Sequence, residues 1–319
     1  MKTITLEEHF VTTEFLKATD ALGGNTPIEI ARMQEKLLDL GDIRLRAMDE
    51  GGVTQQVLSL AAHGLDKLTR ENANVVLGSV HDEAAAAVRA HPDRFAAFAT
   101  PGLRNVPEAI KEIERAITQL GFKGVMIDGT IDNKFLDAPE FFPLLEAIQA
   151  LNVPLYIHPA PPPAAVNDIY YGNLPDNTGF LLSIAGWGWH SETAIHILRL
   201  IVSGVLDRLP QLQIIIGHMG EMLPFALARS NAVFSQAKHL KRSVAETFAQ
   251  QVHITTSGYF TRPPFECART VLGLDRMMYS VDYPFSPTTR GKEFLAALGL
   301  NDTDLAALTH RNAERLLKL

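Results

Sequence analysis

Two carboxylates and two imidazoles stand at the ends of apolar runs that are far apart in this 319-residue chain. Glu7 and His9 end the first run, His158 ends a central one, and Asp282 closes the last. On a strand, the spacing of Glu7 and His9 puts both on one face, with Glu8 on the other. Buried charges must be paired or bound to a metal. If the four residues meet, they suit Zn²⁺ or Mn²⁺, with Mg²⁺ as a further candidate.

Other polar side chains also end apolar runs, and each has an ordinary explanation. Asp128 ends one run, and His218 in the stretch GHMGE ends another, followed by Glu221. His218 could simply open a helix, and Glu221 could occupy the first turn of that helix, where negative charge is favoured. Asp282, before Tyr-Pro, could cap a turn. His63 and His190 fit either a pocket or the surface.

Eight short runs have the composition of strands, and helical spacing lies between them. The runs are Thr3–His9, Gln55–Ala61, Phe95–Pro101, Lys123–Gly129, Val153–Pro159, Leu212–Gly220, Val252–Gly258 and Met277–Phe285. This alternation predicts an α/β fold, a (β/α)8 barrel, with residues 1–319 as a single domain. An open, doubly wound sheet is the alternative, but no Gly-rich phosphate loop follows an early strand. In such a barrel, the chemistry lies at the carboxyl ends of the strands.

Two long connections interrupt the pattern, Ala18–Asp42 and Ala160–His190. The second contains both tryptophans, Trp187 and Trp189. Because long loops in compact domains are often lids or binding loops, we expect a lid over the C-terminal face. Ser191 is the expected N-cap of one helix. The expected helices include Asn72–Ala90, Pro107–Leu120, Glu192–Gly204 and Asp302–Leu319.

Composition restricts the class of protein. The formal net charge of -7 argues against a nucleic-acid partner, which would require a basic face. Cys267 is the only cysteine, which excludes an intramolecular disulfide and fits a reducing compartment. The first residues lack the apolar core of a signal peptide, and no apolar run is long enough for a membrane span. We therefore expect a cytoplasmic protein that binds a small molecule and no membrane.

The sequence resembles the amidohydrolase superfamily over nearly its whole length. The segments that carry the resemblance include LEEHF, HPDRFAAFAT, VPLYIHP, IIIGHMGEMLP and YSVDYPF. They are similar to the branch of metal-dependent, non-oxidative aromatic acid decarboxylases, and in particular to the γ-resorcylate (2,6-dihydroxybenzoate) decarboxylases. Most hydrolytic relatives begin with His-x-His, whereas this chain has Glu7-x-His9. The resemblance therefore favours decarboxylation over hydrolysis.

The resemblance also implies roles for particular residues. It places the metal ligands on Glu7, His9, His158 and Asp282, the catalytic histidine on His218, and the carboxylate partner of that histidine on Glu221. It places Arg229 near the substrate or a subunit contact. Asp128 stands where these relatives have an asparagine that touches a ring hydroxyl. The assembly that the resemblance implies is a homodimer or homotetramer.

The interpretation is a reversible, non-oxidative decarboxylation of a hydroxylated aromatic acid such as a 2-hydroxybenzoate, with one divalent metal ion and no organic cofactor. Asp282 is the candidate general acid, with His218 and Glu221 as its support. Phe10 either walls the pocket or belongs to the core. The alternatives are a metal-dependent hydrolase of a lactone or amide on the same scaffold, and a non-catalytic barrel. The candidate substrate-binding residues are Asp128, Arg229, Phe10, His63, Trp187 and Trp189.

Overall fold

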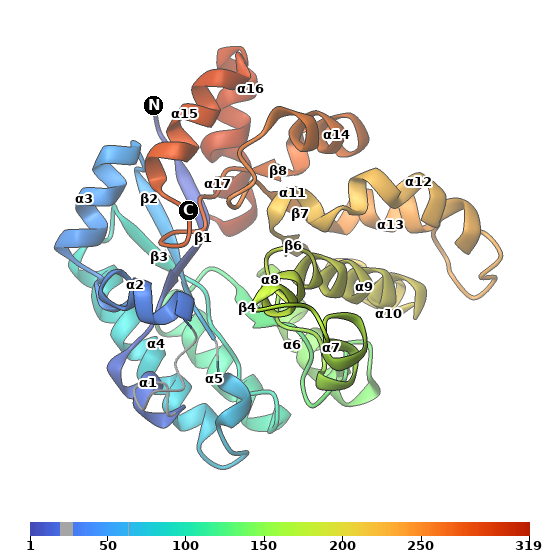
Figure 1. Ribbon diagram of the computed structural model, residues 1–319, viewed down its shortest axis with the longest axis horizontal. Coiled ribbons are helices and arrows are strands. Elements are labelled where there is room, and N and C mark those ends of the chain that lie inside the picture. The colour runs from blue at the N-terminus through green and yellow to red at the C-terminus, as the bar shows by residue number, and fades with distance from the viewer. Residues whose placement is uncertain (20–27, 63) are drawn as a thin grey trace.

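The computed structural model describes residues 1–19, 28–62 and 64–319, and eight parallel strands lie within them. Figure 1 shows these strands at the centre of the molecule with the helices around them. The strands are β1 (Ile4–Phe10), β2 (Gln55–Leu60), β3 (Phe95–Ala97), β4 (Val125–Asp128), β5 (Leu155–His158), β6 (Ile214–Ile216), β7 (Val252–Thr255) and β8 (Met277–Met278).

The strands form a closed barrel through two weak seams. Continuous pairing gives a three-stranded sheet, β1-β2-β3, and a five-stranded sheet, β4 to β8. A bridge between Ala99 and Val125 joins β3 to β4, and a bridge between Glu8 and Tyr283 joins β1 to the segment after β8. The His9 amide donates to the Tyr283 carbonyl at 2.7 Å across the second seam. The predicted (β/α)8 barrel is therefore confirmed over the open-sheet alternative.

Helices follow the strands, and most predicted positions are confirmed within a few residues. The α-helices are α1 (Thr13–Ala18), α2 (Ile28–Leu38), α3 (Asp42–Gly51), α4 (Ala73–Ala90), α5 (Val106–Thr118), α6 (Phe142–Ala150), α7 (Ala164–Tyr170), α8 (Thr178–Ser183), α9 (Gly188–Val202), α10 (Val205–Arg208), α11 (His218–Glu221), α12 (Leu223–Phe234), α13 (Val244–Gln251), α14 (Arg262–Leu272), α15 (Thr288–Leu298), α16 (Asp302–Ala306) and α17 (Asn312–Leu317). Short 3₁₀ segments η1 (Leu65–Lys67), η2 (Pro139–Phe141) and η3 (Leu274–Arg276) and a π-helical turn η4 (Ala307–Arg311) complete the set.

The expected long connections are partly helical. The second contains α7, α8 and the first residues of α9, and the described part of the first contains α2. The predicted N-cap at Ser191 is wrong, because α9 already begins at Gly188 and the Ser191 hydroxyl donates to the Gly188 carbonyl. A lid over the barrel remains a prediction. Within the described ranges, no helix combines the length and the apolar composition that a bilayer span requires.

The strands separate two apolar cores, one inside the barrel and one between the barrel and the helices. Alternate strand residues fill the barrel interior, among them Leu6, Met126 and Tyr156. Residues on the outer strand faces pack against the helices, and Phe10, 1 % exposed, is one of them. The structure thus places Phe10 in the core, on the strand face opposite His9. The reason is strand alternation, which sends Phe10 outward with Glu8.

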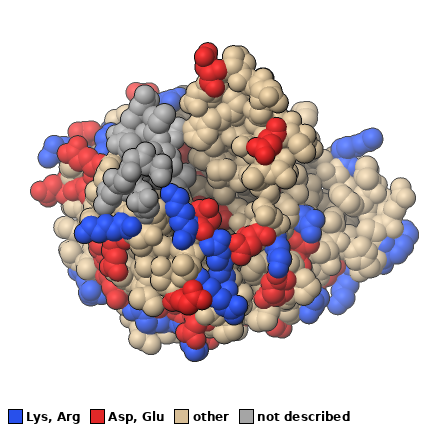
Figure 2. Space-filling model, turned by 60° about the horizontal axis from the view of Figure 1, so that its bottom comes forward, with Lys and Arg blue, Asp and Glu red and all other residues tan. Residues whose placement is uncertain are grey.

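Charged side chains of both signs are mixed on the surface. Figure 2 shows lysines and arginines interspersed with acidic residues over the lower part of one face, while uncharged residues dominate the rest of that face. This distribution fits the net charge of -7.

Phe10→Ala should destabilise the protein by about 3–5 kcal/mol, because the substitution leaves a cavity in a packed core. Denaturant unfolding would measure this change. Phe180→Ala removes the same atoms from a side chain that is 41 % exposed and is the matched control, with a much smaller expected loss. Unchanged stability together with a raised KM would instead place Phe10 at the substrate.

Candidate active site

A β-bulge in β1 determines which side chains of this strand enter the barrel. Its pairing with β2 shifts between Thr5 and Glu8, so that Leu6 and Glu7 together face the single residue Val57. Such bulges redirect side chains and are frequent beside active sites. Because of the extra residue, Leu6 joins the apolar interior and the next residue, Glu7, also points inward. His9 follows on the same inner face.

The Glu7 carboxylate is fully buried, and its two oxygens have different surroundings. Oε2 accepts hydrogen bonds from the hydroxyls of Tyr156 and Ser257. Oε1 has no hydrogen-bond partner among the described residues. A Cβ on Gly217 would stand 2.6 Å from Oε2, so the end of β6 can approach this carboxylate only as glycine. One oxygen is thus fixed by the protein and the other is left available to a ligand.

Two of the other predicted metal ligands, His158 and His9, converge on the available oxygen, and Asp282 lies beside His9. Glu7 Oε1 lies 3.2 Å from His158 Nε2 and 4.0 Å from His9 Nε2, and His9 Nε2 lies 3.3 Å from Asp282 Oδ1. Donors held ~2.0–2.2 Å from one cation stand roughly 3–4 Å apart, so these separations fit a common metal ion. His9 Nε2, like Glu7 Oε1, is buried without a hydrogen-bond partner in the described part of the chain. The arrangement fits a single divalent cation.

Neighbouring residues orient both imidazoles. His9 Nδ1 lies 3.2 Å from the Ser59 hydroxyl on β2, and His158 Nδ1 lies 2.7 Å from Asp128 Oδ1 on β4. The Ser59 contact can direct the second ring nitrogen of His9 toward a metal and fix its tautomer, while the Asp128 carboxylate places a negative charge beside the His158 ring. Asp128 therefore has a contact that its predicted substrate role did not include. Its other oxygen, Oδ2, is buried and has no hydrogen-bond partner among the described residues.

The electrostatics of the centre also suit a cation. Burial lowers the pKa of His9 to about 3, which keeps this imidazole neutral and able to donate a lone pair. Burial would raise the pKa of Glu7, but the neighbouring imidazoles, His218 first, hold it well below its usual range. Burial and the charge of Glu7 raise the pKa of Asp282 to about 7. A divalent cation would neutralise the carboxylates gathered here.

His218 and Glu221 form a second cluster beside the first, and His190 extends it. Glu221 Oε1 lies 2.7 Å from His218 Nδ1, and Oε2 lies 2.6 Å from His190 Nδ1. His218 Nε2 lies 3.7 Å from Glu7 Oε1, so this ring faces the candidate metal centre. His190 Nε2 contacts the Ala185 carbonyl at 3.1 Å. Glu221 thus connects the turn after β6 with the first turn of α9.

The turn that carries His218 has an uncommon backbone. Five consecutive residues, 218–222, have φ values between 50° and 85°. Left-handed conformation costs L-residues roughly 1–2 kcal/mol each. Gly220 is the exception, and a Cβ there would also stand 2.9 Å from Pro224 Cδ. This left-handed turn directs His218 and Glu221 into the barrel mouth, where a right-handed helix would not place them.

Glu8, on the opposite strand face from Glu7 and His9, is held by hydrogen bonds and not by an ion pair. No lysine or arginine in the described ranges forms an ion pair with Glu8. Its carboxylate instead accepts hydrogen bonds from the main-chain amides of Val281 and Tyr283 at 2.9 and 3.3 Å. These are the residues on either side of Asp282. The physical reason is that Glu8 lies at the barrel seam, where the unpaired amides after β8 need an acceptor.

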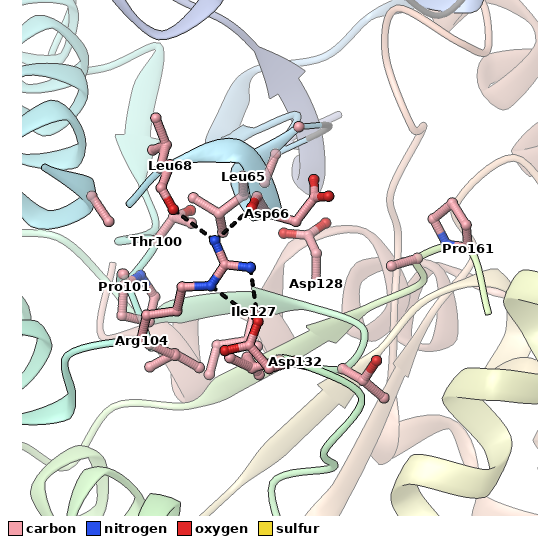
Figure 3. A pocket seen from close by; sticks show the side chains of 18 of the residues that line it. Leu65, Asp66, Leu68, Thr100, Pro101, Arg104, Ile127, Asp128, Asp132 and Pro161 are labelled. Carbon is pink, nitrogen blue, oxygen red and sulfur yellow. Dashed lines mark hydrogen bonds and ion pairs between the residues drawn. The ribbon is translucent and has the colours of Figure 1, made fainter. Parts of the chain in front are cut away.

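A cavity of about 540 Å³ adjoins the candidate metal centre at Asp128. Figure 3 shows the Asp128 side chain in its wall, together with the Arg104 guanidinium, which binds Asp132 and the carbonyls of Asp66 and Leu68. None of the four candidate metal ligands lines this cavity. Its wall is largely apolar and includes Leu65, Leu68, Leu103, Ile127, Ile131 and Pro161. The size falls within the range of small-molecule sites, ~300–1,000 Å³.

Four other expected substrate-binding residues do not line this cavity: Phe10, Trp187, Trp189 and Arg229. Trp187 is 50 % exposed at the start of α9, and Trp189 is half-buried on that helix. Arg229 is exposed on α12. His63 lies outside the described residues. Asp128 is the candidate that the structure brings to both the cavity and the metal centre.

Several functional contacts were missed by sequence reasoning. Tyr156 supports Glu7, and the signal for it was available, because Tyr156 lies two residues before His158 and hence on the same strand face. Ser257 and Ser59 also end strands, but a serine hydroxyl gives little signal of its own. His190 was left undecided, and no sequence pattern connects it with Glu221.

Comparison with known proteins agrees with this geometry. The amidohydrolase family model matches residues 12–319. The decarboxylase orsB of Emericella nidulans is 34 % identical, with 99 % of this chain and 97 % of the relative covered. The γ-resorcylate decarboxylase of Polaromonas sp. is also 34 % identical, with 99 % and 98 % covered.

A solved structure extends the comparison. A dihydroxybenzoic acid decarboxylase from Polaromonas sp., with bound manganese and the inhibitor 2-nitroresorcinol, superposes with a TM-score of 0.89 at 32 % identity. All of this chain and 97 % of that structure are covered. A match of this extent follows from a common ancestry of the whole barrel, and the chain belongs to the amidohydrolase family.

Proposed function

We propose that this protein catalyses the reversible, non-oxidative decarboxylation of a hydroxylated aromatic acid such as a 2-hydroxybenzoate, with a divalent metal ion. The observation that carries the proposal is the ligand set itself, in which Glu7 and His9 from β1 converge with His158 and Asp282. A carboxylate replaces the first histidine of the hydrolytic pattern, and the relatives at about a third identity over the full chain act as decarboxylases.

The four ligands suit Mn²⁺ or Zn²⁺, and Mg²⁺ is a further candidate. The manganese in the related structure supports Mn²⁺ as the first choice. When bound, such a cation would supply Lewis-acid stabilisation of negative charge on the oxygens of the substrate. The buried, unpartnered Glu7 Oε1 and His9 Nε2 are the atoms that would hold it.

In the chemical step, the ring carbon that bears the carboxylate accepts a proton. The bond to the carboxylate then breaks, CO₂ leaves, and the bonding electron pair restores the aromatic ring. Asp282 is the proposed general acid, because its carboxyl group lies at the proposed centre, with Oδ1 3.3 Å from His9 Nε2. His218, supported by Glu221, orients this carboxyl group. The ring itself accepts the electrons, so the step requires no organic cofactor.

Asp128 Oδ2 is the proposed acceptor for a second hydroxyl on the ring. This oxygen is buried without a partner in the described residues, and its carboxyl group forms part of the cavity wall. The apolar part of the cavity would take the ring and its substituents. The proposed substrate contacts therefore lie on the side of the centre formed by the loops after β2 to β5.

We also propose that residues 1–319 act as one cytoplasmic catalytic domain, since β1 and the segment after β8 supply ligands to one centre and the lone Cys267 thiol is free.

The first experiment is a screen of hydroxybenzoates for CO₂ release with Mn²⁺, Zn²⁺ or Mg²⁺ added to metal-depleted protein. We expect release with at least one 2-hydroxybenzoate and its loss on chelation. Lactones and amides are assayed in parallel. Hydrolysis of either, without CO₂ release from any acid, would favour the alternative of a metal-dependent hydrolase.

Asp282→Asn should lower kcat for decarboxylation at least 100-fold, because the amide cannot donate the proton that a general acid supplies. Steady-state kinetics and metal analysis of the same preparation would be measured together. Asp302→Asn, at the first residue of α16, is the control and should leave kcat unchanged. Near-normal turnover by a metal-loaded Asp282→Asn variant would remove the proton-donor role.

The assembly is proposed to be a homodimer or homotetramer, with α12 at the subunit contact. Phe225, Arg229 and Val233 stand four residues apart on one face of α12, and all three are exposed, Phe225 by 87 %. An exposed apolar stripe of this kind commonly marks a protein contact. Figure 1 shows α12 projecting from the barrel, away from β1. If Arg229 contacts substrate, it does so from a neighbouring subunit.

Phe225→Asp should dissociate the assembly, because it places a charge in a desolvated contact. Sedimentation velocity would show a shift to a smaller species. Val75→Asp changes a residue that is 72 % exposed on α4 and is the control. An unchanged sedimentation coefficient for Phe225→Asp, or a monomeric wild-type protein, would exclude α12 as the contact.

A further inference from the structure

Glu8 lies beside the proposed centre but points away from it, and all of its contacts are with hydrogen-bond donors. Oε1 accepts from the Val281 amide at 2.9 Å and from the Ser280 hydroxyl at 3.1 Å. Oε2 accepts from the Tyr283 amide at 3.3 Å and from Gln56 Nε2 at 3.2 Å. The side chain is fully buried. Four donors and no acceptor surround a carboxylate that binds no metal and touches no substrate.

Two of these donors are the main-chain amides of the residues immediately before and after Asp282. The amides of residues 281 and 283 both point at Glu8, so the residue between them has its backbone held from both sides. Asp282 has φ of 70°, a left-handed conformation that a non-glycine residue adopts only when its surroundings impose it. The Glu8 carboxylate supplies that constraint. The direction of the Asp282 side chain therefore depends on Glu8.

The same carboxylate is connected to the bulge that directs Glu7 inward. The Ser280 oxygen accepts from the amides of Leu6 and Glu7 at 3.1 and 2.8 Å, and these are the two bulged residues. A hydroxyl has one proton, and with two amides donating to its oxygen, that proton goes to Glu8. Ser280 thus joins the bulge to Glu8.

Arg44 completes the network on the side away from the barrel. Its guanidinium, fully buried, donates to Gln56 Oε1 at 3.2 Å and to the His9 carbonyl at 2.5 Å, and it lies 4.8 Å from the centre of the Tyr283 ring. Gln56 in turn donates to Glu8. We call Glu8, Ser280, Gln56 and Arg44 the Glu8 network. It provides a cation near the buried carboxylate without a direct ion pair.

We propose that Glu8 is a positioning residue that sets the relative placement of Glu7 and Asp282, the two proposed ligands that meet across the seam between β1 and β8. The proposal rests on the proposed metal centre but not on which reaction that centre catalyses. Glu8 acts through the main chain. It holds Asp282 through the two flanking amides and Glu7 through the Ser280 hydroxyl.

Glu8→Gln tests the proposal with almost no change in volume. Each carboxylate oxygen receives two donors, so in either orientation of the amide an NH₂ group faces two donors and repels them. We expect the affinity for Mn²⁺ and kcat to fall 10–100-fold, the range found when groups that orient metal ligands are altered. Titration of free Mn²⁺ by electron paramagnetic resonance measures the affinity without reference to catalysis. Glu50→Gln, an exposed change of the same kind, is the matched control.

A double variant separates positioning from general stability. In an Asp282→Asn background, Glu8→Gln should lower Mn²⁺ affinity by a clearly smaller factor, because residues that act through each other are not additive. The proposal would be overturned if Glu8→Gln lowered the Mn²⁺ affinity by the same factor with and without Asp282→Asn. A folded Glu8→Gln protein with normal Mn²⁺ affinity and kcat would also overturn it. If Glu8→Gln fails to fold, Ser280→Ala takes its place, with reduced Mn²⁺ affinity expected and normal affinity contradicting the proposal.

The outcomes distinguish this proposal from the proposed function. A wild-type protein that binds no divalent metal contradicts both the metal centre and the role of Glu8. A protein that binds Mn²⁺ but decarboxylates no hydroxybenzoate contradicts the proposed reaction alone, and the affinities still decide the role of Glu8.

Discussion

The charge of Glu7 inside a closed barrel is the constraint around which the site is built. A carboxylate with no exposure requires hydrogen bonds or a counter-charge. The protein supplies two hydroxyl donors to one oxygen and directs the imidazoles toward the other. The position of this carboxylate depends on two local features. Gly217 leaves room for it, and the bulge in β1 turns it inward. A cation at Glu7 Oε1 would balance the buried negative charge that the two hydroxyls leave uncompensated.

The position of the site at a seam links the chemistry to the closure of the barrel. β1 contributes Glu7 and His9, and the segment after β8 contributes Asp282, so the first and last strands must meet before these candidate ligands can. Among the described residues, a bridge and a main-chain hydrogen bond pair the two sides of this seam, and side chains of the Glu8 network add further contacts. The residues of the Glu8 network therefore both close the barrel and bring the candidate ligands together.

Much of this arrangement could be predicted from the sequence because it depends on local periodicity. Alternation placed Glu7 with His9 and separated Glu8, and apolar runs located the eight strands. The bulge could not be predicted, because its stabilising partner, Ser280, is more than 270 residues away and has no distinctive pattern. The contact of His190 with Glu221 is equally non-local. Phe10 was ambiguous for a different reason, since an aromatic residue after a ligand suits a pocket and a core equally well.

The left-handed turn at residues 218–222 has a consequence for how the protein responds to heat. Conformations of this kind persist only while their surroundings impose them, and regions of low local stability open before the whole molecule does. The contacts of Glu221 with two imidazoles restrain the turn, which also packs against β7 and α9. On heating, the direction of His218 is therefore maintained only while this packing around the turn persists.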